Sequence, residues 1–172
     1  MRLPLSAALL GLIALPAAAQ DYPRRLPASG GEVIVPSARH QQTYDSWRYA
    51  PARRMGDTLY VSGAIVFRGD TEGNDLAAFE GQVRRTFRQL DTVLKAAGAS
   101  FNDVAMINSF HVWTGPHFTG TPDQQIEVIN KVKAEFITGE QPAWTAVGTT
   151  GLLSGERGLV EIQIIAHAPQ GR

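Results

Sequence analysis

An amphipathic stretch between Asn74 and Gly98 places the strongest constraint on the fold of this chain. Apolar residues recur along it at steps of three and four, the period of one helix face: Leu76, Phe79, Val83, Phe87, Leu90, Leu94 and Ala97. Asn74 or Asp75 stands at the expected N-cap, and Gly98 stands where a glycine commonly ends a helix. A helix with one apolar stripe must bury that stripe against another layer of structure. We therefore expect a long helix packed on a sheet.

Strand patterns lie on either side of this helix and again near the end of the chain. The runs with β-branched, aromatic or alternating apolar residues are Leu59–Phe67, Val104–Trp113, Ala143–Thr149 and Leu159–Ala168. A second helix is expected between Thr121 and Gly139, because Thr121 and Gln124 have the spacing of a capping box. This order favours an α+β fold in which a mixed sheet carries both helices on one face.

The residues before Leu59 have weaker patterns. Residues 20–31 contain Pro, Arg and Gly and are expected to form an extended, poorly ordered arm. Glu32–Val35 predicts a short edge strand, residues 37–46 predict a loop, and a strand-like run begins at Trp47. We divide the chain into a signal peptide at 1–19, an N-terminal extension at 20–46, one domain at 47–168 and a C-terminal tail at 169–172.

The start of the chain has the composition of a secretory signal peptide. Arg2 supplies a positive charge, Leu3–Leu15 is apolar but too short to span a bilayer, and Ala17–Ala19 fits the rule for cleavage sites. We expect cleavage after Ala19 and a mature protein that is periplasmic or secreted, with no membrane attachment. Retention as an uncleaved anchor is the weaker alternative. The sequence has no cysteine, which excludes disulfides, thiolate metal sites and cysteine nucleophiles.

Charge and histidine patterns limit the partners of the protein. Lys+Arg and Asp+Glu number 16 each, and no basic stripe is present, so we expect no nucleic-acid partner. The histidines show no H-x-H or H-E-x-x-H spacing, and we assign no metal. The sheet face away from the helices would present Tyr60, Trp113 and Ile165, which predicts a homo-oligomer.

The stretch Gln141–Ala168 carries the two residues that most constrain function. Trp144 begins one predicted strand, and Glu161 stands between apolar residues in the next. A carboxylate inside an apolar strand is costly unless it is paired or hydrated. Glu161 is therefore either a group that positions water for a reaction or a partner in an inter-subunit salt bridge or hydrogen bond.

Most of the mature chain, from about Tyr49 to Ala166, resembles the Rid/YjgF family of RidA-like reactive-intermediate deaminases, also called endoribonuclease L-PSP-like proteins. The segments that carry the resemblance are GDTLYVSG at 56–63, LKAAGAS at 94–100, NDVAMINSFHVW at 102–113, Pro142-Ala143 and VEIQIIA at 160–166. The resemblance implies a homotrimer with a chorismate-mutase-like fold and small-molecule clefts between subunits. It also implies cofactor-free hydrolysis of enamines or imines, such as 2-aminoacrylate, to a keto acid and ammonia.

The resemblance assigns site residues position by position. The family's Ser-Gly pair falls on Ser62 and Gly63, its cleft tyrosine on Tyr49, its helix asparagine on Asn130 and its last-strand carboxylate on Glu161. Glu161 is thus the candidate catalytic residue, positioning water. The others are candidate substrate-binding residues, as are Trp144 and His111, the latter sharing a strand face with Trp113. A satisfied structural histidine is the commoner alternative for His111, and an ordinary interface tyrosine is the alternative for Tyr49.

The chain departs from the family where Pro-Ala-Arg becomes Pro142-Ala143-Trp144. In the family the arginine holds the substrate carboxylate, whereas an indole offers only a stacking face and one N–H donor. A substrate lacking that carboxylate is expected, unless Arg48, Arg68 or Arg157 enters the cleft. Packing at a subunit interface explains Trp144 equally well.

Two classes of function remain open from the sequence. The leading hypothesis is an exported hydrolytic deaminase of imine or enamine compounds. The alternative is a non-catalytic protein that binds a small ligand in the same cleft, and a holdase that uses exposed apolar surface is a weaker third. Ser62 lacks the surroundings of a nucleophile, so a hydrogen-bonding role or a turn requirement is expected for it.

Overall fold

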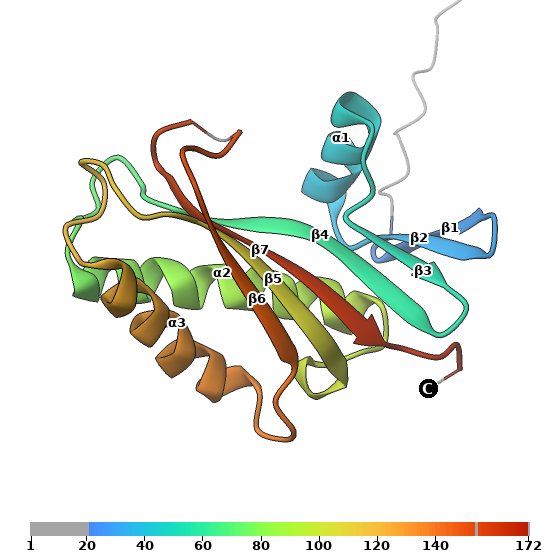
Figure 1. The fold of residues 1–172 in the computed structure, drawn as a ribbon. Helices are drawn as coiled ribbons and strands as arrows, with labels where there is room; N and C mark the ends of the chain where they lie inside the picture. The colour runs from blue at the N-terminus through green and yellow to red at the C-terminus, as the bar shows by residue number, and fades with distance from the viewer. Residues whose placement is uncertain (1–20, 154, 172) are drawn as a thin grey trace, which may run out of the picture.

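A mixed, seven-stranded sheet organises the computed structural model, which describes residues 21–153 and 155–171 (Figure 1). The elements in chain order are β1 (Arg24–Ala28), β2 (Gly31–Val35), α1 (Ala38–Trp47), β3 (Ala52–Met55), β4 (Thr58–Phe67), α2 (Leu76–Ala96), a 3₁₀ turn (Phe101–Asp103), β5 (Val104–Val112), α3 (Pro122–Phe136), β6 (Ala143–Thr149) and β7 (Gly158–His167). The strand order is β1-β2-β3-β4-β7-β5-β6, with only β5 and β6 parallel. The predicted α+β fold is confirmed.

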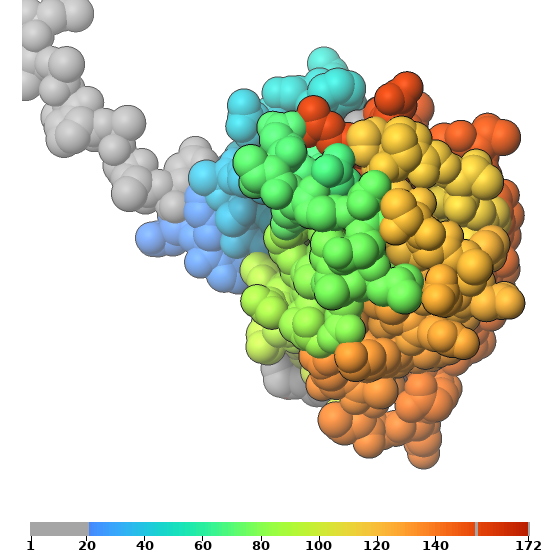
Figure 2. Space-filling model, turned by 90° about the vertical axis from the view of Figure 1, so that its left-hand side faces the viewer, coloured from blue at the N-terminus to red at the C-terminus, as the bar shows by residue number. Residues whose placement is uncertain are grey.

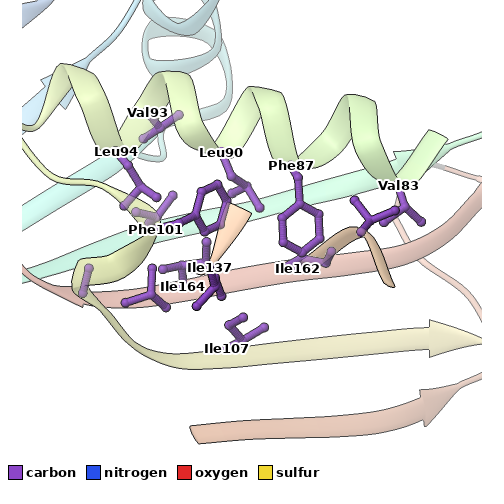
Figure 3. Close-up of a cluster of buried hydrophobic side chains, with 14 of the residues drawn as sticks. Val83, Phe87, Leu90, Val93, Leu94, Phe101, Ile107, Ile137, Ile162 and Ile164 are labelled. Atoms are coloured by element: carbon purple, nitrogen blue, oxygen red, sulfur yellow. The ribbon is translucent and has the colours of Figure 1, made fainter. Parts of the chain in front are cut away.

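The main core lies between the sheet and the two long helices, α2 and α3, which cover one face (Figure 1). Apolar side chains of α2 meet those of β5 and β7 in this layer, including Phe87, Ile107 and Ile162 (Figure 3). Burying one such side chain contributes about 1.5–3 kcal/mol. The stripe predicted for residues 76–97 is therefore the face that holds α2 on the sheet.

The predicted caps are present at both ends of α2 and at the start of α3, whereas α3 ends at Phe136, before the Gly139 that the sequence suggested. The Asp75 side chain accepts a hydrogen bond from the Ala78 backbone N–H at 2.8 Å, and Gly98 adopts a φ of 73° beyond the last turn of α2. Thr121 and Gln124 form both bonds of a capping box at the start of α3. These local signals fix both ends of α2 and the start of α3.

The arm predicted for residues 20–31 is wrong, because Arg24–Ala28 forms β1 in a hairpin with β2. β2 is consequently an interior strand rather than an edge. Arg25 and Arg54 both pair with Glu32, and they donate to the carbonyls of Ala96, the last residue of α2, and Ala97, its C-cap. Helix C-terminal carbonyls need such donors. The hairpin is thus held by contacts distant in sequence, which a local pattern does not reveal.

The loop predicted at residues 37–46 is also wrong, since these residues form most of α1, and Trp47 ends that helix rather than starting a strand. α1 has no buried residue, so it lacks the apolar stripe that identifies a packed helix. Segments near the N-terminus and α1 lie along one side of the molecule, away from α3 (Figure 2). α1 leads directly into Tyr49 through Arg48, whose φ is 59°.

Arg48 is the only non-glycine residue with positive φ in the described part of the chain, and this conformation costs an L-residue about 1–2 kcal/mol. Glycine relieves that cost but loses more entropy on folding. We therefore expect Arg48→Gly to raise the free energy of unfolding by about 0.5–1 kcal/mol in urea titrations. Gln42→Gly, inside α1, should lower it by about 1 kcal/mol. An Arg48→Gly variant less stable than the parent would contradict the prediction.

Candidate functional site

A β-bulge in the middle of β4 shapes the candidate site. Val61 pairs with Ile164 of β7 and Ala64 pairs with Ile162, so two residues of β4, Ser62 and Gly63, oppose one residue of β7. β-Bulges disrupt a ladder locally and re-aim the chain. Pairing with β3 also stops at Val61, which leaves the following edge of β4 open.

Ser62 connects this bulge to the segment that follows α1. Its backbone N–H donates to the Pro51 carbonyl at 3.0 Å, and its hydroxyl donates to the Ala50 carbonyl at 2.6 Å. These bonds hold Tyr49 beside the bulge. Because the hydroxyl proton is used in this way, Ser62 acts in the structure as a positioning group.

A cavity of about 560 Å³ lies beside the bulge, within the range of small-molecule sites. Tyr49, Ser62 and Gly63 all line it, so the structure brings three of the sequence-predicted residues together. Its other walls come from α1, α2 and the open edge of β4. The side chains contributed by the two helices are Arg39, His40, Thr43, Arg85, Gln89, Leu90 and Val93.

The helix residues in this wall were missed by the sequence analysis. α1 has no apolar period, so nothing in its sequence indicated that Arg39 and His40 would face a cavity. The arginines considered instead, Arg48, Arg68 and Arg157, do not line it.

Glu161 lies on the other side of Gly63. A Cβ atom at position 63 would overlap the carboxylate and stand 2.6 Å from Glu161 Cδ, so the side chain rests directly on the glycine. A second cavity of about 390 Å³ is lined by Gly63, Glu161, Phe110, Gln163 and neighbouring loop residues. Gly63 borders both cavities, which places the half-buried carboxylate next to the site that Tyr49 and Ser62 line.

Trp144 and His111 lie away from both cavities, in a hydrogen-bonded series on the face of the sheet that the helices cover. The Trp144 N–H donates to Ser109 Oγ at 2.8 Å, and that hydroxyl lies 2.7 Å from His111 Nε2. His111 Nδ1 lies 2.8 Å from the Gln125 side-chain oxygen, and the Gln125 amide donates to the Val112 carbonyl. The Gln125 amide oxygen can only accept, so His111 Nδ1–H donates to it. In the neutral ring Nε2 then carries no proton and accepts from the Ser109 hydroxyl.

Burial favours the neutral form of His111. Desolvation lowers the pKa of His111 below its ordinary value, against the opposing effect of its bond to Gln125. Trp113 stacks on His111 with centroids 4.5 Å apart, so it is not on the open sheet face where the sequence placed it. Lys133 of α3 lies 4.6 Å from the Trp144 ring centroid, and burial lowers its pKa.

Asn130 lies on the exposed side of α3. Within one chain, the structure therefore groups Tyr49, Ser62 and Gly63 with Glu161, and separates them from Trp144, His111 and Asn130. Among the described residues, no cluster of three or more His, Asp or Glu side chains is arranged to hold a metal ion. No helix in that part of the chain is both long enough and apolar enough to cross a membrane.

The mixed sheet, with its bulge in β4 and its two long helices on one face, defines an α+β fold of the YjgF/L-PSP type. The family model described as Endoribonuclease L-PSP matches residues 40–168, and the chain belongs to this family. It is 38% identical over 138 residues to the RutC family protein YjgH of Escherichia coli, covering 80% of this chain and 95% of that protein. It is 30% identical over 117 residues to a 2-iminobutanoate/2-iminopropanoate deaminase of Dermatophagoides farinae, covering 68% and 83%.

Solved structures show the same relationship. A structure of protein YjgH has a TM-score of 0.61 at 37% identity and covers 80% of this chain and 96% of that one. RidA from an Antarctic Psychrobacter has a TM-score of 0.54 at 28% identity, covering 69% and 87%.

Proposed function

We propose that this chain is a cofactor-free hydrolytic deaminase of imine or enamine compounds that lack the carboxylate held by the family's Pro-Ala-Arg arginine. The observation that carries the proposal is the position of Glu161 on Gly63, beside a cavity that Tyr49 and Ser62 line. The similarity to an imine deaminase supports the reaction class.

The reaction needs water at the imine carbon and protons moved between oxygen and nitrogen. Water adds to the carbon, the C–N bond then breaks, and ammonia leaves as the carbonyl forms. A carboxylate beside the cavity is suited to accept a proton from the attacking water and return it to the leaving nitrogen. Tyr49, also at the cavity, carries a hydroxyl that both donates and accepts hydrogen bonds.

A homotrimer with the cleft between subunits is part of this proposal. Tyr60, Phe110 and Val147 are exposed large apolar side chains of β4, β5 and β6. Exposed apolar surface of this kind marks a contact between proteins. A neighbouring subunit that covers it would also bring its own residues toward Glu161, whose register partner in β5 is Phe110. We further propose export, because the N-terminal pattern favours cleavage after Ala19. Residues 1–20 lie outside the described structure.

The test is turnover by the purified mature protein on neutral imines and on 2-aminoacrylate, followed by release of ammonia. We expect neutral imines to be hydrolysed and Glu161→Gln to lower kcat/KM by about 10²–10⁴-fold, since that variant removes the proton acceptor while keeping the shape. Glu127 is an exposed residue of α3, so Glu127→Gln makes the same chemical change away from the site and should leave activity unchanged.

Turnover that persists in Glu161→Gln would contradict the assigned role. Efficient turnover of 2-aminoacrylate would contradict the inference from Trp144. Saturable ligand binding with no turnover on any substrate would favour the non-catalytic binding protein instead.

A further inference from the structure

The side chains of the Asp, Glu, His, Lys and Arg types that line the 560 Å³ cavity are all basic ones. Arg39 and His40 reach it from α1, and Arg85 reaches it from α2. No Asp or Glu of the described chain is part of the lining. Although Arg39 and Tyr49 are exposed at the rim, a cavity lined by one sign of charge favours a ligand group of the opposite sign.

The charge of Arg85 is already compensated inside the protein. Its guanidinium donates to both carboxylate oxygens of Glu72, at 2.5 and 3.1 Å, and to the Phe67 carbonyl at 2.6 Å. The hydrogen bond from Arg85 is the main reason that the pKa of Glu72 falls to about 2. Arg85 therefore shapes the wall but leaves little charge for a ligand.

Arg39 is different, since its guanidinium has no ion pair or hydrogen bond with any residue in 21–153 or 155–171. His40 beside it is engaged through Nδ1, 2.8 Å from Ser37 Oγ. Burial, and then the charge of Arg39, lower the pKa of His40, so this ring is neutral at neutral pH. The uncompensated charge in the wall is thus the guanidinium of Arg39.

We propose that the cavity binds a ligand with an anionic group of the carboxylate class, and that Arg39 on α1 pairs with that group. A guanidinium suits this role because its planar donors match the two oxygens of a carboxylate. This inference rests on the proposed function, which places the reacting carbon of the ligand beside Ser62 and Gly63. The anionic group would then lie further along the ligand, toward α1, and not next to the C–N bond.

Two stable ketones test the pairing between Arg39 and an anionic group directly. Each has a carbonyl group at the position of the imine or enamine C–N bond of the proposed substrate. 4-Oxopentanoate and 2-pentanone have the same chain length and differ only in a carboxylate remote from the carbonyl. Calorimetric titration of the mature protein should show at least about tenfold tighter binding of 4-oxopentanoate, as one charge-assisted pair provides. Arg39→Ala should abolish that preference, and Arg39→Lys should retain part of it.

Arg88→Ala is the matched control. Arg88 is an exposed arginine of α2 outside the cavity lining, so its removal changes net charge equally and should leave the preference intact. Equal binding of the two ketones by the parent protein, or a preference that survives in Arg39→Ala, would overturn the proposal. An Arg39-dependent preference in a protein that hydrolyses no imine would support the anion site and reject the deaminase.

Discussion

Gly63→Ala is expected to abolish most of the proposed activity while leaving the protein folded. The added Cβ would occupy the space of the Glu161 carboxylate, since it would overlap the end of that side chain. The three atoms nearest to that Cβ all belong to the Glu161 side chain, so the carboxylate is expected to swing away. We expect kcat/KM to fall by about 10²–10⁴-fold, as in loss of a general base, and stability to change by about 1 kcal/mol.

The comparison variant is Gly81→Ala on α2. A Cβ atom there meets nothing within 4 Å, and alanine in a helix interior is more stable than glycine by about 0.5–1 kcal/mol. This variant should keep full activity and gain stability in urea titrations.

Combining Gly63→Ala with Glu161→Gln should cost no more activity than either change alone, because both remove the same group from the same place. Activity near the parent level in Gly63→Ala would show that Glu161 need not lie on Gly63 to work. Additive losses in the double variant would show that the two residues act separately.

The sequence predicted the long helices and most of the strands because their signals are local. Thr121 and Gln124 satisfy each other across one helical turn, and the stripe from residues 76 to 97 requires only a face to bury against. β1 and α1 lack such signals. Arg25 of β1 pairs with Glu32 of β2 and donates to the Ala96 carbonyl at the end of α2, a contact distant in sequence. α1 buries no side chain.

The candidate site was predictable in part, because some of its residues also form local sequence motifs. Ser62 and Gly63 were found as one motif and Glu161 as an unusual strand carboxylate, but their contact depends on a two-to-one bulge between β4 and β7. The environment of Trp144 depends on register too. Trp144 pairs with the buried Ile107 and so faces the helices, where Ser109 accepts its N–H.

Ser109→Ala is expected to lower the free energy of unfolding more than any other variant proposed for this protein, although it removes a single oxygen atom. The hydroxyl of Ser109 is buried and serves both the Trp144 N–H and His111 Nε2. Removing it leaves the buried His111 Nε2 and the partly buried Trp144 N–H without that partner, and an unsatisfied buried group costs about 1–3 kcal/mol. We expect the free energy of unfolding to fall by about 2–4 kcal/mol in urea titrations.

Asn108→Ala on the same strand is the control for that loss. Asn108 is only partly buried and makes a single long bond of 3.4 Å to Gln163, so its removal should cost less than about 0.5 kcal/mol. Equal losses in the two variants would mean that the Trp144–Ser109–His111–Gln125 series contributes no specific stability. A specific loss in Ser109→Ala would mean that Trp144 stabilises the parallel pairing of β5 and β6 at the edge of the sheet. This structural role would account for an indole where the resemblance to the family leads us to expect an arginine.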